Sequence, residues 1–274
     1  MKQLFLFLFS GIILLSSCEN TKKNTEDNPS DEKTGVNVTI NENNEAVIVM
    51  PESKTGEKAK PLGLARDTTI QAGNENELTP EEKERRLELR RAKTAFNNGM
   101  QYYQEGSYEQ AIDAFKMVLQ MDENNDKAFF NLGKIYAMQG QPDLALSYYE
   151  DAVRLNPNDS ASLLGIGMYY YNLGDFNNAL SYYNRSIEAG PGYAMAYYNR
   201  GTVSGQMKNY AESLADLTKA IELDPNNDQA YMNRGLAYFY SKKNDMACLD
   251  WKKAAEMGNP EAVKAVGLYC TDKK

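Results

Sequence analysis

From residue 92 onward, apolar residues recur at the three- and four-residue spacing of amphipathic helices, and the whole pattern returns every 34 residues. The motif YYNRG at 197–201, for example, comes back as YMNRG at 231–235. Five units follow one another without a gap: 92–125, 126–159, 160–193, 194–227 and 228–261. We therefore expect five helical hairpins, each made of two antiparallel helices.

Fixed positions within the unit indicate how the two helices of a hairpin pack. The eighth position is always glycine, the twentieth is Ala or Ser, and the twenty-fourth is a large apolar residue: Phe115, Tyr149, Tyr183, Leu217 and Trp251. Small residues let two helices approach closely, and the large side chains fill the space beside them. Pro157, Pro191 and Pro225 predict the end of the second helix in their units, because proline lacks the donor that a continuing helix needs.

The period and this small/aromatic pattern resemble the tetratricopeptide repeat family over residues 92–261. The resemblance implies an all-α fold, a right-handed superhelix or α-solenoid of five helix-turn-helix repeats. Such an array needs caps at both ends. Residues 77–91 predict a charged leading helix that begins with the capping box of Thr79 and Glu82, and residues 262–274 predict a capping helix and tail.

The N-terminal segment predicts export and lipidation. Lys2 precedes the apolar run LFLFLFSGIILL, which has the length of a signal-peptide core, and Leu15-Ser-Ser-Cys18 resembles a bacterial lipobox. We interpret residues 1–17 as a signal peptide and Cys18 as the lipidated first residue of the mature protein. This places the chain in the cell envelope, at the outer membrane on its periplasmic face or surface.

Residues 18–76 have the composition of a flexible tether, rich in Asn, Glu, Lys, Thr and Ser. Within this tether, VNVTI and AVIVM are able to pair as a β-hairpin. We expect disorder instead, because an isolated two-stranded hairpin is only marginally stable in water.

The amino-acid composition excludes several classes of function. The chain has 30 basic and 38 acidic residues, a net charge of -8 and no histidine. A negative surface disfavours nucleic acid, and the lack of imidazole excludes Ser-His or Cys-His catalysis and histidine metal ligands. We expect a protein that is not an enzyme and that uses no cofactor or metal.

The family resemblance implies that positions 2, 5, 6, 9, 12 and 13 of the first helix line a concave groove. None of the thirty residues at these positions is acidic. Position six is asparagine in four repeats, which favours a ladder that grips a peptide backbone, although asparagine there is also explained by helix packing. The predicted groove residues are Lys93, Phe96, Asn97, Met100, Lys127, Phe130, Asn131, Lys134, Met168, Tyr171, Tyr198, Asn199, Met232 and Asn233.

This groove favours an extended peptide with apolar anchors and, beside the lysines of the first two repeats, an acidic end. The carboxylate clamp of chaperone-binding members is absent, because its Lys and Asn positions hold Phe96 and Met100, or Phe130 and Lys134. Chaperone tails are therefore disfavoured as ligands.

Two further pairings are expected from comparing the repeats with one another. Arginine stands at position seven only in the two repeats that have aspartate at position twenty-three, which predicts structural ion pairs between Arg200 and Asp216 and between Arg234 and Asp250. Cys248 and Cys270 fall at the same height on either side of a predicted turn. They form either a disulfide or two buried thiols, and the second alternative is slightly favoured.

These observations favour a membrane-anchored adaptor or assembly factor that binds peptide segments of partner proteins. The alternative is a structural subunit of an envelope complex for pilus, secretion or outer-membrane assembly, which contacts its neighbours through the convex face or the ends of the array. The arginines of the leading helix, Arg85, Arg86, Arg90 and Arg91, are either a docking patch for acidic lipid or protein or a solvated helix face, and the solvated face is favoured.

Overall fold

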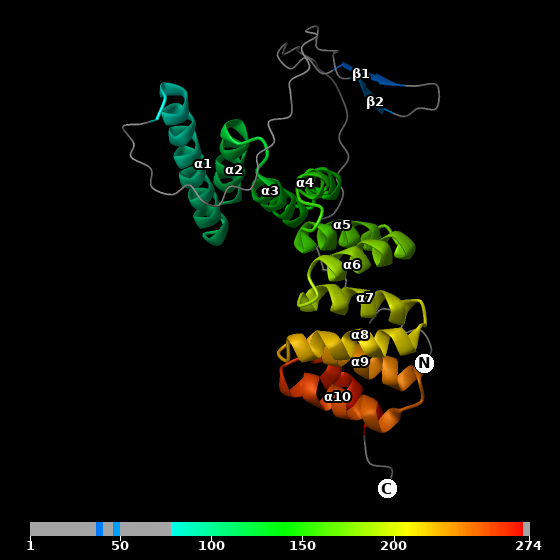
Figure 1. Cartoon of the computed structure of the whole chain (residues 1–274). Coiled ribbons are helices and arrows are strands. Elements are labelled where there is room, and N and C mark those ends of the chain that lie inside the picture. Colours follow the sequence, from blue (N-terminus) through cyan, green and yellow to red (C-terminus); the bar gives the residue numbers. More distant parts are fainter. Residues whose placement is uncertain (1–36, 41–45, 50–77, 271–274) are drawn as a thin grey trace, which may run out of the picture. The chain divides into compact units, whose positions relative to one another are not determined.

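The computed structural model describes residues 37–40, 46–49 and 78–270 (Figure 1). Residues 78–270 belong to one compact unit and fold into helices, as the repeats predict. The helices are α1 Pro80–Gln104, α2 Tyr108–Met121, α3 Asp126–Met138, α4 Pro142–Leu155, α5 Ser160–Asn172, α6 Phe176–Ala189, α7 Ala194–Gln206, α8 Tyr210–Leu223, α9 Asp228–Tyr240, α10 Asn244–Glu256 and α11 Pro260–Tyr269.

The helices begin where the repeat boundaries predict. The last position of a repeat caps the first helix of the next one, and the side chains of Asn125 and Asn227 accept hydrogen bonds from the backbone N–H groups of Ala128 and Ala230. The turn inside each of the first three repeats has a glycine with positive φ. In the last two repeats Lys208 and Lys242 adopt the same left-handed conformation, so the turn keeps its shape without glycine.

Each hairpin is held together by the glycine at position eight and the large side chain at position twenty-four. A Cβ atom added to Gly99 would lie 2.9 Å from the ring of Phe115, and one added to Gly201 would lie 2.9 Å from Leu217 Cγ. Any other residue would push the two helices apart. Phe115, Leu217 and Trp251 are fully buried, and this confirms the expected packing of small residues against large ones.

Each helix packs on the next one along the chain, from α1 to α11, which makes an α-solenoid. At its start, Thr79 Oγ1 accepts a hydrogen bond from the N–H of Glu82, and the Glu82 carboxylate accepts one from the N–H of Thr79. The predicted leading helix is continuous with the first helix of repeat one, and together they form α1. At the other end α11 packs on α10, where the capping helix was expected.

Residues 37–49 contain an antiparallel β-hairpin, made of β1 Asn37–Ile40 and β2 Ala46–Val49, in which Val38 pairs with Ile48. Our expectation of disorder is wrong for these two strands. They are rich in the β-branched residues that favour a pleated backbone. The predicted signal peptide, Cys18 and the rest of the predicted tether lie outside the described residues.

Within the part of the chain that the structure describes, no helix combines the length and the apolar character needed to cross a lipid bilayer.

Candidate functional site: the inner face of the repeats

The candidate site is the face formed by the first helices of successive repeats. Besides packing on their sequence neighbours, α3, α5, α7 and α9 each contact the first helix of the adjacent repeat. No equally extensive contact joins successive second helices in residues 78–270. The array therefore bends toward the first helices, and their shared surface is called here the inner face.

In repeats four and five the inner face is partly closed by its own side chains, although Met195 and Tyr240 are exposed. The Asn233 amide donates hydrogen bonds to Thr202 Oγ1 at 3.1 Å and to the Tyr198 hydroxyl at 3.4 Å. Burial raises the pKa of the Tyr198 hydroxyl. Met232 and Asn233 are 2% and 4% exposed. The prediction that these two side chains line an open groove is therefore wrong: Asn233 joins α9 to α7, and Met232 packs in the core that α9 forms with α10 and α11.

The asparagine ladder is interrupted for the same reason. Asn131 is 7% exposed, and its amide nitrogen donates to the carbonyl oxygen of Lys127, one turn earlier in α3, at 2.7 Å. Asn199 is half-buried, whereas Asn97 on α1 is exposed. The Asn233 amide bonds to Thr202 on the first helix that precedes its own, and the Asn131 amide bonds within α3. Packing, the second explanation offered by the sequence, therefore accounts for Asn131 and Asn233.

Repeats one to three leave the inner face open. Lys93, Asn97 and Lys127 are exposed, and Met138 and Met168 are 53% and 44% exposed. These side chains combine flexible apolar surface with positive charge and an amide. Such a surface is able to bind an extended peptide through apolar contacts and hydrogen bonds.

A small cluster connects repeats one and two on this open surface. The Tyr103 hydroxyl donates to Met138 Sδ at 3.4 Å, and Lys134 Nζ lies 4.5 Å from the centre of the Tyr103 ring. The cation–π contact orients the ammonium group of Lys134 along the inner face. Met138 holds the Tyr103 ring, and the ring positions the ammonium group of Lys134. The sequence alone gave only the helix face on which Lys134 lies.

The predicted aromatic anchors, Phe96 and Phe130, lie partly in the core and partly at the surface. Phe96 packs edge-on against Phe115 with 5.4 Å between ring centres, and Phe130 lies 6.1 Å from the Tyr149 ring. Each is half-buried, so it presents one part to the core and another to the surface. The remaining predicted groove residues are also half-buried: Met100, Lys134, Tyr171, Tyr198 and Asn199.

Two residues that the sequence argument did not single out complete the closed part of the face. Thr202 accepts the hydrogen bond from Asn233, and Gln206 Nε2 donates to the Tyr171 hydroxyl at 2.6 Å. Both occupy groove positions of repeat four. The available signal was their polarity at positions nine and thirteen, where other repeats have apolar residues such as Met100 and Met138.

The two expected ion pairs are present on the side of the array where position seven faces position twenty-three. Arg200 Nε and Nη2 donate to the two Asp216 oxygens at 2.8 and 2.6 Å, and Arg234 meets Asp250 in the same way at 2.8 and 2.7 Å. Hydrogen bonding to the partner carboxylate is the main reason that the pKa of each arginine is raised. The pairs are structural, and they lie within single repeats.

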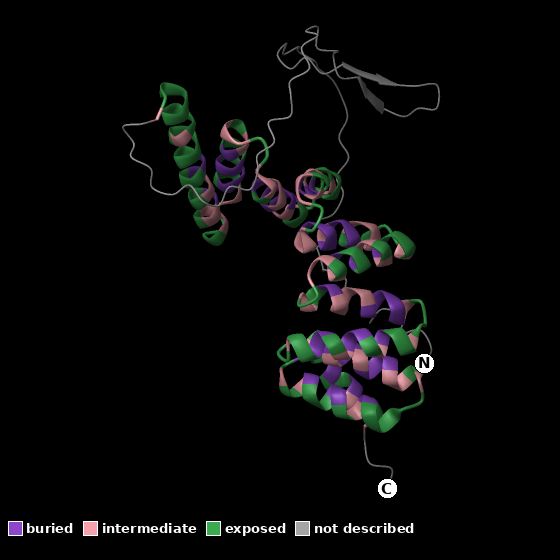
Figure 2. Cartoon of the chain, viewed as in Figure 1, coloured by how far each residue is buried: buried purple, intermediate pink, exposed green. Residues whose placement is uncertain are grey.

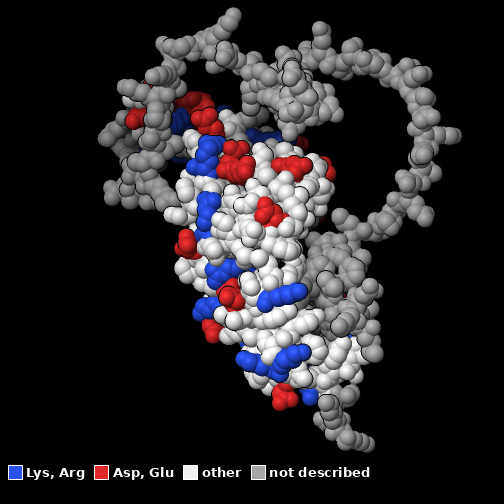
Figure 3. Space-filling view, turned by 90° about the vertical axis from the view of Figure 1, so that its right-hand side faces the viewer, with Lys and Arg blue, Asp and Glu red and all other residues white. Residues whose placement is uncertain are grey.

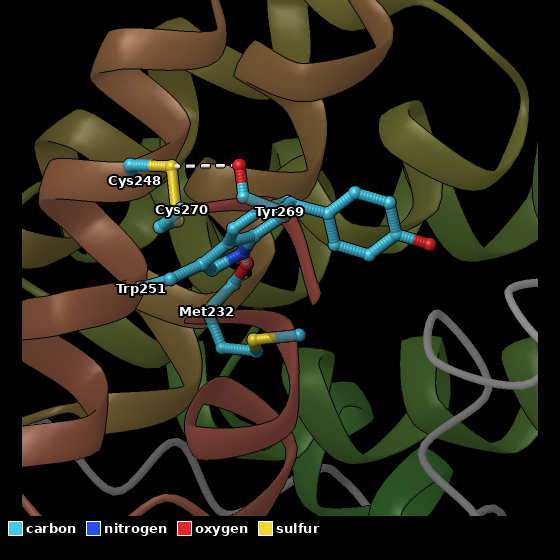
Figure 4. Close-up of a disulfide and its surroundings, with 5 residues drawn as sticks. All are labelled: Met232, Cys248, Trp251, Tyr269 and Cys270. Atoms are coloured by element: carbon cyan, nitrogen blue, oxygen red, sulfur yellow. Dashed lines mark hydrogen bonds between the residues drawn. A yellow bond between two sulfur atoms is a disulfide. The ribbon is translucent and has the colours of Figure 1, made fainter. Parts of the chain in front are cut away.

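Cys248 and Cys270 form a disulfide with 5.5 Å between their Cα atoms (Figure 4). Of the two alternatives that the sequence left open, the disulfide is present, so the preference for buried thiols is wrong. Beside it, Trp251 Nε1 donates to the carbonyl oxygen of Met232, which ties α10 to α9. The Tyr269 ring lies 5.9 Å from the Trp251 ring, so α11 is fixed by both the covalent bond and aromatic contacts.

The charges of the array are unevenly distributed. Figure 3 shows one face on which uncharged side chains predominate; Lys and Arg side chains lie along one edge and across the lower part, with Asp and Glu side chains among them. Residues 78–270 contain no group of three or more His, Cys, Asp or Glu side chains arranged to hold a metal ion.

Comparison with known proteins agrees with this geometry. Models described as TPR repeat or tetratricopeptide repeat match residues 99–140, 126–159, 160–192 and 194–227. A search of curated proteins by sequence finds no match.

Among solved structures, a crystal structure of MamA is 30% identical, with a TM-score of 0.51, and the match covers 61% of this chain and 96% of MamA. YrrB, described as a TPR protein with an unusual peptide-binding site, is 21% identical, with a TM-score of 0.53 and coverages of 69% and 95%. PilF of Pseudomonas aeruginosa is 18% identical, with a TM-score of 0.58 and coverages of 66% and 90%. The last two likenesses show the fold alone. The repeat matches and the likeness to MamA over nearly its whole length show that this chain belongs to the tetratricopeptide repeat family.

Proposed function

We propose that this chain is a lipid-anchored adaptor or assembly factor of the bacterial cell envelope, which binds an extended segment of a partner protein on the inner face of repeats one to three. The observation that carries the proposal is the contrast between the two halves of that face. In repeats four and five its polar groups bond to one another, whereas Asn97, Lys127 and Met138 are exposed. An exposed surface of this composition fits a protein ligand and offers no group for catalysis.

The similar structures support a protein-binding role. YrrB is described by its peptide-binding site, and PilW, another structure of this fold, is described as a type IV pilus biogenesis factor. Tetratricopeptide arrays of this kind are typically interaction scaffolds without enzymatic activity. The disulfide between Cys248 and Cys270 supports an oxidising compartment, as does the lipobox-like sequence that ends at Cys18.

The test is affinity capture from the native membranes with the lipidated full chain as bait. The variant Asn97→Ala/Lys127→Ala/Met138→Ala changes only exposed inner-face side chains, and we expect it to lose most of the captured partner. The matched control on the outer surface of α2 is Gln110→Ala/Asp113→Ala/Met117→Ala, whose three side chains are also exposed. We expect the control to retain the partner, and equal capture by both variants would contradict the proposal. Replacing Asn131 or Asn233 is unsuitable here, because both are buried and their loss would affect stability.

A second candidate, a structural subunit held by the end of the array, is favoured by one observation. Leu249 on α10 and Val263 and Leu268 on α11 are large apolar side chains that are exposed at the C-terminal end. Leu249→Ser/Leu268→Ser tests this candidate in the same capture experiment. Loss of the partner in this variant, together with retention in the inner-face variant, would establish end contact as the correct function.

A further inference from the structure

The first part of α1 extends beyond the repeats. α1 has 25 residues and its partner α2 has 14, so about 16 Å of α1 has no α2 beside it. The buried residues of α1 are Ala92, Ala95 and Gly99, none of which precedes the midpoint of the helix. Figure 2 shows the first half as almost entirely exposed. Residues 80–91 are therefore exposed along several turns of helix, except Arg86, which is half-buried.

Most of the charges on this extension are sorted by helix face. Lys83, Arg86, Arg90 and Lys93 are spaced by three, four and three residues, so they share one side of the helix, and this set is called here the basic stripe. Glu81, Glu84 and Glu88 lie on the opposite side, in line with the residues that pack on α2. Glu82 lies one turn before Arg86 on the basic side, and Arg85 and Arg91 flank the acidic side. The basic stripe is therefore predominantly, but not wholly, positive.

The basic stripe leads directly into the open inner face. Lys93 is its last member and also a predicted groove residue, and Asn97 follows one turn later on the same side of α1. Farther along the inner face are Lys127 and Lys134, and no groove position in the array is acidic. A series of basic residues, called here the positive path, therefore runs from Lys83 to repeat two in a chain whose net charge is -8.

We propose that the basic stripe docks an acidic, extended segment of the same partner whose apolar residues lie on the inner face of repeats one to three. This inference rests on the function proposed above and adds the charge and the direction of the ligand. The acidic part lies along residues 83–93, and the apolar part lies toward Met138 and Met168 on α3 and α5.

An anionic membrane surface is the competing partner for a basic helix, but the geometry favours a peptide. The positive path continues past Lys93 along the side toward which the solenoid bends, and a flat bilayer cannot follow it there. An extended chain can contact Lys93, Lys127 and the exposed methionines together. Electrostatic attraction of this kind mainly accelerates association and is weakened by salt.

The experiment uses two fluorescein-labelled peptides and the full chain with Cys18→Ser, which prevents lipidation. One peptide has an acidic half of Asp, Glu and Ser and an apolar half of Leu, Met and Tyr, and the other has Asn and Gln in place of the acids. Binding is measured by fluorescence anisotropy at low and high salt. We expect the acidic peptide to bind at least about tenfold more tightly at low salt and to lose this advantage at high salt.

Two matched variants locate the interaction. Arg86→Gln/Arg90→Gln removes two charges from the basic stripe, whereas Arg85→Gln/Arg91→Gln removes two charges from other sides of the same helix. Circular dichroism verifies that both remain helical. We expect the first variant to lose the preference for the acidic peptide and the second to retain it.

The other outcomes separate this inference from the proposed function. Equal binding of both peptides by the parent chain would leave the proposed function standing and overturn the basic stripe as a docking site. Binding of neither peptide would overturn both. Vesicles that contain phosphatidylglycerol provide the last comparison: vesicle binding that depends on Arg86 and Arg90, combined with unchanged peptide affinity, would assign the basic stripe to a membrane surface and reject the peptide.

Discussion

The ion pair in the last repeat gives the sharpest prediction about stability. Arg234→Leu removes the guanidinium that donates two hydrogen bonds to Asp250 and a third, from Nη1, to Thr218 Oγ1 at 3.2 Å. Repeats two and three show what the fold does without this pair. They have Leu132 with Tyr148 and Ile166 with Tyr182 at the same two positions.

The expected magnitude follows from burial. The side chains of Arg234 and Asp250 are 16% and 8% exposed, so removing the arginine leaves a carboxylate with little access to water. Breaking such a buried pair from one side costs about 3 kcal/mol. Replacing both partners leaves no stranded charge, and we expect Arg234→Leu/Asp250→Tyr to unfold within about 1 kcal/mol of the parent chain.

In the variant Arg234→Leu/Asp250→Tyr, the introduced tyrosine ring has space and a stacking partner. Tyr148 stacks on Tyr136, four residues after Leu132, with 5.3 Å between ring centres and an interplanar angle of 4°. Repeat five has Tyr238 at the position of Tyr136, so the introduced tyrosine has the same partner available. The double variant therefore copies a complete arrangement that the chain already uses.

The fluorescence of Trp251 allows the unfolding of repeat five to be followed separately. It is the only tryptophan of the chain, it is fully buried, and it follows Asp250 directly. Urea unfolding followed by its fluorescence reports on repeat five, which matters because repeat arrays need not unfold as one unit. An unchanged midpoint for Arg234→Leu, or a double variant no more stable than the single one, would refute the reasoning.

Two further predictions concern the core and the C-terminal end. Ser213 Oγ is buried without a hydrogen-bond partner in the described part of the chain, so we expect Ser213→Ala to stabilise the array by about 1 kcal/mol in urea unfolding. Ser186→Ala should destabilise it by a similar amount, because Ser186 Oγ donates to the carbonyl oxygen of Ser160 at 2.7 Å. For the disulfide, thiol titration of the unreduced, denatured full chain carrying Cys18→Ser should find no thiol, and two after reduction. Reduction should remove about 3 kcal/mol from the attachment of α11, visible as faster amide exchange there.

The architecture follows from the sequence because it depends on positions that repeat. Glycine at position eight, the large residue at position twenty-four and the cap at the end of each unit recur, so each repeat reinforces the assignment of the others. The ion pairs followed from the same comparison, because Asp216 and Asp250 occur only where Arg200 and Arg234 do. The hairpin at residues 37–49 has no such repetition, and the weak stability of isolated hairpins led to the wrong expectation.

The site was harder to predict because its character depends on how far each first helix lies from the next. Positions five and six of repeat five carry Met232 and Asn233, which the family pattern places on a groove. In this chain the polar side chain of Thr202 meets Asn233 across the α7–α9 contact, and the pair is buried. One sequence gives the side of the helix on which a residue lies, but it does not give the spacing between helices that exposes or covers that side.

The two halves of the solenoid consequently use their polar residues differently. In repeats four and five, several polar residues bond to other residues of the array. Arg200 and Arg234 form ion pairs with aspartates, and Asn233 joins two first helices. Each of these contacts fixes one packing arrangement, because the alternative leaves a buried polar group without a partner. The first repeats use tyrosine stacking and apolar contacts instead, as in the pair of Tyr136 and Tyr148. Of the inner-face polar residues in these repeats, Asn97 and Lys127 are exposed and not required for packing. Selection for a partner can therefore act on these two residues without loss of stability.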